Sequence, residues 1–161
     1  MSAFEAYDSA KHQRRFFDAI RLYRNSDYEG ALTIICEITA GVNKNDVNIN
    51  KYQSYEGLMR VCLGDRLAVA VCRELAGVSF DDVEVHYNLA LAEYKLGNRQ
   101  RAVLAVQRGM AIDADYPELR RLRAVMGLRR EPVIGFLGRD NLVNKWLGKL
   151  SYSKHGRSDR L

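Results

Sequence analysis

The sequence contains few of the residues that interrupt helices or that build crosslinked or membrane-embedded folds. Its only prolines are Pro117 and Pro132, so long helices can run unbroken up to Pro117. The cysteines Cys36, Cys62 and Cys72 are odd in number and lack close spacing, which argues against a disulfide framework or a zinc site. No run approaches the roughly 18 apolar residues of a membrane span, and the N-terminus lacks a signal-peptide core. These features predict a cytoplasmic protein with no transmembrane segment.

Residue patterns typical of catalysis are also missing. The three histidines, His12, His86 and His155, lie far apart, and none forms a nucleophile or metal-ligand pattern with a cysteine. The glycines fall at expected helix ends and helix crossings, so there is no glycine-rich phosphate-binding loop. We therefore expect no enzymatic activity, no cofactor and no metal site.

The chain has enough residues for one globular domain, and its charge is unevenly distributed. It contains 161 residues, of which 47% are hydrophobic and 28% charged. The formal net charge is +5. Residues 117–161 hold eleven Lys and Arg against four Asp and Glu, a charge of +7, which leaves −2 for residues 1–116. A basic C-terminal part is most often a solvated surface, but it can also attract acidic proteins, nucleic acid or anionic lipid.

Apolar residues recur at three- and four-residue steps along most of the chain, which predicts a series of helices. Residues 1–9 are expected to form a lead-in. Asp27 or Ser26, and then Asp81 or Asp82, are suited to cap helices, and Pro117 is suited to begin one. The predicted helices span 10–24, 28–39, 51–63, 66–76, 117–129 and 141–150, together with a helical hairpin over 83–116.

The hairpin at 83–116 is the clearest element, because two apolar stripes flank a Gly97-Asn98 turn. Neither helix can bury its stripe alone, so the hairpin needs neighbours. The preceding window, 49–82, has the same length of 34 residues and repeats part of the pattern. The equivalent pairs are Ala68 with Ala102, Cys72 with Val106 and Tyr55 with Leu89.

This period matches the tetratricopeptide repeat (TPR), and the window 83–116 resembles that family. The matching positions are Leu89-Ala90, the turn residue Gly97, the small residue Ala102 and the acidic Asp113. His86, Glu93 and Ala114 depart from the family pattern. Window 49–82 is more degenerate, with Glu56 where a small residue is expected. The first hairpin, 12–45, resembles the family mainly in Asp27-Tyr28-Glu29-Gly30-Ala31-Leu32.

The resemblance implies an all-α fold, a right-handed α-α superhelix of about three TPR-type hairpins with a C-terminal capping helix. Residues 1–129 would form the repeats, over 12–45, 49–82 and 83–116 with an extra helix at 117–129. Residues 130–150 would form a capping or docking helix, and 151–161 a basic flexible tail. Small residues such as Ala90, Ala102 and Gly109 are expected where helices cross closely.

The resemblance also implies a binding surface, because the first helix of each hairpin lines the concave face of such a superhelix. That face could hold an extended peptide through polar, aromatic and basic groups, although it could equally be a solvated inner surface. The family's carboxylate clamp for chaperone C-termini is matched only by Asn88. Carried over by position, the groove residues are Gln53, Arg60, Tyr87, Asn88, Leu91, Tyr94, Lys95 and Arg121.

The predicted C-terminal helix is a second candidate surface. It either caps the last repeat or docks on a partner protein or an anionic membrane. Its apolar stripe consists of Leu142, Val143, Trp146, Leu147 and Leu150.

Together these features predict a non-catalytic interaction module or scaffold that binds a peptide or helix of another protein. Two alternatives stay open: a small secretion-type chaperone with a TPR fold, and an adaptor that binds nucleic acid or an anionic membrane through the basic tail. Binding to nucleic acid is the weaker of these, because aromatic residues are not interleaved with the basic ones.

Overall fold

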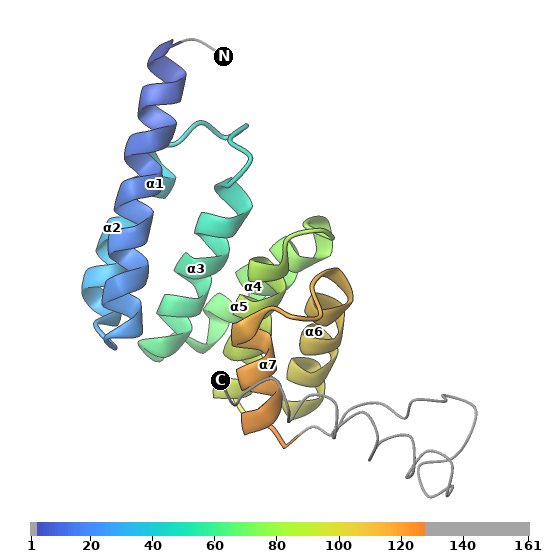
Figure 1. The fold of residues 1–161 in the computed structure, drawn as a ribbon. Helices are drawn as coiled ribbons and strands as arrows, with labels where there is room; N and C mark the ends of the chain where they lie inside the picture. The colour runs from blue at the N-terminus through green and yellow to red at the C-terminus, as the bar shows by residue number, and fades with distance from the viewer. Residues whose placement is uncertain (1–2, 128–161) are drawn as a thin grey trace, which may run out of the picture. The chain divides into compact units, whose positions relative to one another are not determined.

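The computed structural model describes the backbone of residues 3–127 and the side chains of residues 10–127 (Figure 1). The helices belong to one compact unit that ends at Val125. They are α1 Ala3–Arg24, α2 Tyr28–Gly41, α3 Ile49–Cys62, the short 3-10 helix η1 Arg66–Ala68, α4 Val69–Val78, α5 Val83–Lys95, α6 Arg99–Ile112 and α7 Pro117–Val125. The prediction of an all-α fold is confirmed for this part of the chain. The predicted docking helix, including Trp146, and the basic tail lie outside the described residues.

Helices α2 and α5 begin where short acidic side chains can satisfy free backbone N–H groups. The Asp27 carboxylate accepts from the N–H of Gly30 at the start of α2. The Asp82 carboxylate accepts from the N–H groups of Glu84 and Val85 at the start of α5. Both caps were among the residues that the sequence suggested, and α7 begins at Pro117 as predicted.

Two predicted boundaries were wrong by four residues or more. The first helix begins at Ala3, not at residue 10, because residues 3–9 contain no proline or glycine to stop it. The last described helix ends at Val125 and does not reach residue 129. Gly127 follows with a φ of +64°, a left-handed conformation that ends a helix and that glycine adopts without strain.

Successive helices pack against one another, and the first helices of neighbouring hairpins also meet. Helix α1 packs on α2, α3 on α4, and α5 on α6, while α3 contacts α5 and α5 contacts α7. Burial follows the 34-residue relation between the two windows. Of the seven buried residues of α5, five have a buried counterpart 34 positions earlier in α3. These counterparts are Tyr52, Ser54, Tyr55, Leu58 and Met59.

Aromatic rings connect α1 to α3. The ring of Phe16 lies 5.0 Å from that of Tyr52 and 5.3 Å from that of Tyr55, measured between centroids. These rings pack with apolar side chains of α2, such as Ile35 and Ile38, in one buried cluster. Large aromatic residues therefore fill the space between the first helices at this end of the stack, and they position the ring of Tyr55 beside the groove described next.

Candidate binding groove

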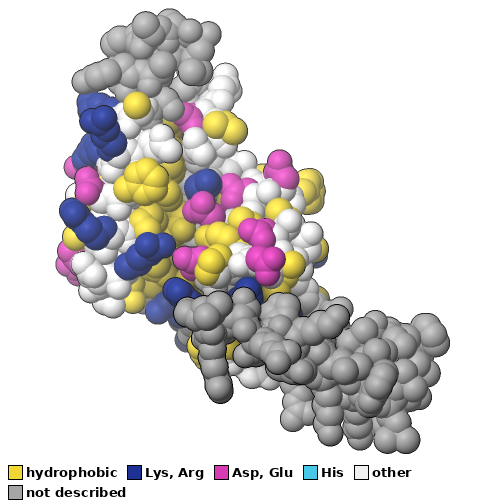
Figure 2. Space-filling model, viewed as in Figure 1, with side chains coloured by type: hydrophobic (Ala, Val, Ile, Leu, Met, Phe, Trp, Pro, Cys, Tyr) yellow, Lys and Arg dark blue, Asp and Glu magenta, His cyan; other side chains and the backbone are white. Residues whose placement is uncertain are grey.

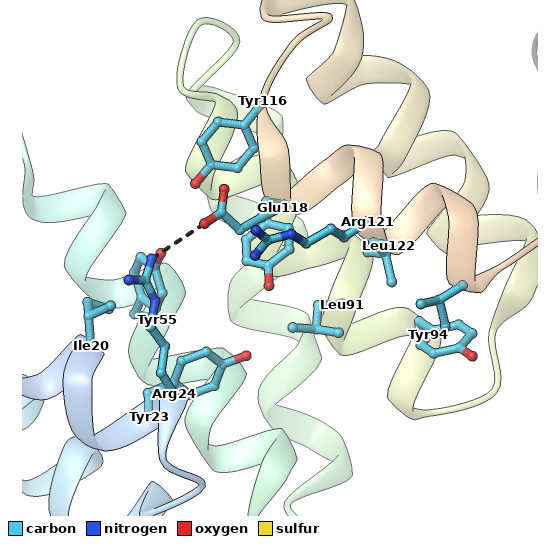
Figure 3. A pocket seen from close by; sticks show the side chains of 12 residues that line it. Ile20, Tyr23, Arg24, Tyr55, Leu91, Tyr94, Tyr116, Glu118, Arg121 and Leu122 are labelled. Atoms are coloured by element: carbon cyan, nitrogen blue, oxygen red, sulfur yellow. Dashed lines mark hydrogen bonds and ion pairs between the residues drawn. The ribbon is translucent and has the colours of Figure 1, made fainter. Parts of the chain in front are cut away.

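A groove of about 370 Å³ lies on the face formed by α1, α3 and α5, the first helices of their hairpins, together with α7 (Figure 3). Five tyrosines and four aliphatic residues make most of its wall, together with two arginines and one glutamate. The lining residues are Ile20, Tyr23, Arg24, Tyr55, Tyr87, Leu91, Tyr94, Tyr116, Glu118, Arg121, Leu122 and Val125. In this text "the groove" means this set of residues.

The tyrosine rings contact one another in edge-to-face pairs. Tyr87 and Tyr116 have ring centroids 6.0 Å apart, and Tyr23 and Tyr55 have centroids 6.3 Å apart. The hydroxyl of Tyr55 donates to the carboxylate of Glu84 over 3.2 Å, which fixes the direction of that ring. Such pairs are favourable beyond the area they bury, so the wall of the groove is largely preformed.

Four tyrosines of the groove, Tyr23, Tyr55, Tyr87 and Tyr116, have a raised pKa and are un-ionised hydrogen-bonding groups with apolar faces. Burial raises the pKa of Tyr23, and the neighbouring Tyr87 adds to this effect. Burial also raises the pKa of Tyr116, reinforced by the negative charges of Glu84 and Glu118. These side chains can therefore donate hydrogen bonds to a peptide backbone while their rings contact its side chains.

Two arginines and a glutamate provide the charges of the groove. Arg24 of α1 forms an ion pair with Glu118 of α7, with 3.4 Å between Nη2 and Oε1. Figure 3 shows this contact as a dashed line. Arg121 is exposed on α7, and no ion pair connects it to another residue of the described chain. The groove therefore offers one paired and one unpaired guanidinium.

Four of the eight predicted groove residues line the groove: Tyr87, Leu91, Tyr94 and Arg121. The other four lie outside its lining. Arg60 bonds through its guanidinium to Glu56 on its own helix, and Lys95 lies over the ring of Tyr28, 5.5 Å from its centroid. Gln53 is half-buried on α3.

Asn88 faces the interior rather than the groove. Its side chain is fully buried, and its amide donates to the hydroxyl of Ser54 over 2.8 Å. The placement of Asn88 on an open surface was therefore wrong, because that face of α5 packs against α3. Asn88 was the only residue that matched the family's carboxylate clamp, and its buried side chain is not available to bind a ligand carboxylate.

Sequence reasoning missed the contributions of α1, of Tyr55 on α3 and of the segment before α7. Tyr23, Tyr55 and Tyr116 line the groove, although none was among the predicted residues. A signal was present, since Tyr23, Tyr55 and Tyr87 follow one another at steps of 32 residues. This step differs from the 34-residue period, so aligning the windows by that period did not bring these tyrosines together.

The cysteines and His86 do not form a reactive group in the described part of the chain. Burial raises the pKa of the Cys72 thiol to about 12, and it also raises the pKa of Cys36 and Cys62. A protonated thiol is a poor nucleophile. Burial lowers the pKa of His86, whose ring is almost completely covered. Among residues 10–127, no three His, Cys, Asp or Glu side chains are grouped so as to hold a metal ion.

None of the helices between residues 3 and 127 combines the length and the apolar character that a membrane crossing requires. The sequence matches no protein-family model, and none of the curated proteins is significantly similar to it.

Proposed function

We propose that this chain is a TPR-type interaction protein that binds an extended segment of a partner protein in the groove. The observation that carries this proposal is the position of the groove on α1, α3, α5 and α7. In a superhelix of α-α hairpins, the first helices form the concave face, where ligands bind. The 34-residue relation in burial between α3 and α5 supports a repeat of this kind.

The chemistry of the groove favours binding over catalysis. Tyrosines supply rigid contact area with few rotatable bonds, and their hydroxyls can bond to the carbonyl groups of a peptide. Leu91 and Leu122 supply apolar contacts between the aromatic rings. Glu118 is the single acidic residue of the groove lining, which lacks the serine, cysteine and lysine nucleophiles and the histidine base that are common in covalent catalysis. We infer a non-catalytic module or scaffold that acts in the cytoplasm.

A peptide-display selection against the full-length protein tests this function. A library of short random peptides is selected on wild type, on Leu91→Arg in the groove and on Leu104→Arg, a control. Leu104 lies on α6, is 55% exposed and is not part of the groove, so the control makes the same chemical change on another face. We expect one family of peptides to be enriched on wild type and on Leu104→Arg, and to be lost on Leu91→Arg. Equal enrichment on all three proteins would contradict the proposal.

A further inference from the structure

The end of the groove near Tyr116 holds a guanidinium in the free protein. Arg24 extends from α1 towards Glu118 of α7, a residue 94 positions away in the chain (Figure 3). The Arg24 side chain is 68% exposed, and the ion pair is long at 3.4 Å. Exposed pairs of this kind contribute little free energy. The contact therefore shows that a guanidinium fits beside Glu118. Because the pair is weak, the guanidinium of another molecule could replace that of Arg24.

The surroundings of Glu118 favour a positive charge. Burial raises the pKa of Tyr55, and the negative charge of Glu84 raises it further; Tyr116 is affected in the same way by Glu84 and Glu118. Lys51 pairs with Glu84 at 3.2 Å and offsets part of this negative potential. The faces of tyrosine rings also attract cations. Figure 2 shows hydrophobic side chains gathered in the middle of the face in view. Acidic side chains predominate on the side of this hydrophobic surface away from α1.

The guanidinium of Arg121, which has no ion-pair partner among the described residues, would favour an anionic ligand instead. A carboxylate that approached this end of the groove would, however, lie beside Glu118 and near Glu84. An arginine of the ligand would replace Arg24 and leave the charge balance unchanged, while Arg24 would return to solvent. Binding a cationic group beside Glu118 therefore has a lower electrostatic cost than binding a carboxylate there.

We propose that the groove selects partner segments containing an arginine, whose guanidinium pairs with Glu118 beside Tyr116 and displaces Arg24. Arg24 then acts as an internal competitor of the ligand. Arginine suits the position better than lysine, because its planar guanidinium both stacks on aromatic rings and bonds to a carboxylate. This inference rests on the proposed function, since it names the ligand chemistry of the same groove.

The two partners of the ion pair give the test, because removing each should have the opposite effect. The probes are the peptides selected on wild type and their Arg→Ala counterparts, with affinity measured by fluorescence polarisation. We expect Arg24→Gln to bind the selected peptides about two- to fivefold more tightly, because the competitor is gone. Glu118→Gln should bind about tenfold more weakly and should no longer distinguish a peptide from its Arg→Ala counterpart. Arg21→Gln, also on α1 but paired with Asp18, is the matched control and should bind as wild type.

The outcomes separate this inference from the proposed function. If Leu91→Arg fails to abolish selection, the groove does not bind peptides and both proposals fail. If selection depends on Leu91 but the peptides lack a required arginine, only the cationic inference fails. The same holds if Arg24→Gln weakens binding, since that result would make Arg24 a ligand contact rather than a competitor.

Discussion

The side-chain amide of Asn88 donates a hydrogen bond of 2.8 Å to the hydroxyl of Ser54, which lies 34 positions earlier in the chain. The two residues occupy equivalent positions in the windows 83–116 and 49–82, so the bond joins corresponding points of α5 and α3. Both side chains are fully buried. The hydroxyl of Ser54 in turn donates a hydrogen bond of 2.8 Å to the carbonyl oxygen of Lys51. Two residues that are equivalent under the 34-residue period are therefore in direct contact across α3 and α5.

This contact predicts a measurable coupling between the two residues. Ser54→Ala would leave a buried amide donor of Asn88 without its acceptor, at a cost of about 1–3 kcal/mol. Asn88→Ala should cost a similar amount, because it removes the bond and leaves a small cavity. Urea denaturation of the single variants and the double variant should give a coupling energy of at least about 0.5 kcal/mol. Strict additivity would show that the bond does not contribute to stability.

A second buried polar contact joins three elements. Glu93 of α5 is almost completely covered, and its carboxylate accepts two bonds from Arg73 of α4, at 2.6 and 3.0 Å. It accepts a third, of 2.7 Å, from the amide of Asn98 just before α6. Burial is the largest single influence on the pKa of Glu93 and raises it, but the hydrogen bonds from Arg73 and Asn98, together with the charges of Arg73 and Arg101, outweigh it. The pKa of Glu93 is lowered as a result.

Replacing Arg73 by methionine should reverse the way in which the stabilising contribution of Glu93 depends on pH. In wild type the lowered pKa means that the contribution of Glu93 is present above its unfolded pKa and is lost as the pH falls through the folded value. Without Arg73, burial would raise the pKa, so the contribution would be present at low pH and lost as the pH rises. We expect a loss of about 2 kcal/mol at pH 8, less than for fully buried pairs because Arg73 is 38% exposed.

Denaturation of Arg73→Met and wild type at pH 8 and pH 5 measures this reversal. The loss should be smaller at pH 5. Glu93→Gln is the control, because its side-chain amide does not titrate. The difference in unfolding free energy between Glu93→Gln and Arg73→Met should become smaller as the pH falls. A loss for Arg73→Met that is the same at both pH values would contradict the assignment.

Two glycines should respond to alanine in opposite directions. A Cβ at Gly109 of α6 would lie 2.5 Å from Cδ1 of Leu119 and 3.3 Å from Cβ of His86, so neighbouring side chains must move. We expect Gly109→Ala to destabilise the protein by about 1–3 kcal/mol. Gly77 of α4 has no atom within 4 Å of a built Cβ, so Gly77→Ala should stabilise by about 0.5 kcal/mol through helix propensity. Thermal melts that shift in the same direction for both variants would refute this reading.

The helices could be predicted from the sequence because the signals for them are local. Asp27, Asp82 and Pro117 mark helix starts by their own chemistry, and the close packing at Gly109 followed from its position in the second helix of the hairpin. The family pattern expects a small residue at position 56, where Glu56 stands. The small residue that packs against α4 is its neighbour Gly57, where a Cβ would meet the sulfur of Cys72 at 2.9 Å.

The groove could be predicted only in part, because it depends on how separate hairpins are rotated relative to one another. Leu91 and Arg121 follow from the position of the first helices. Tyr23 depends on the register of α1, and the first hairpin resembles the family mainly in residues 27–32, which lie after α1. The Arg24 to Glu118 pair joins residues of the first and last described helices, and no local pattern indicates such a contact.

His86 gives the last prediction, a loss of stability in mild acid. Burial lowers the pKa of His86 below its ordinary value of 6.5, and the charge of Arg108 adds to this while Asp82 opposes it. No described residue bonds to its buried Nδ1. A lowered folded-state pKa means that the stabilising contribution is present above the unfolded pKa and is lost as the pH falls below about 6.5, at up to about 1.4 kcal/mol per pH unit. Phenylalanine cannot titrate, so urea denaturation from pH 7 to pH 5 should show a shallower decline for His86→Phe than for wild type. Parallel declines would mean that His86 is protonated equally well in the folded and unfolded chains.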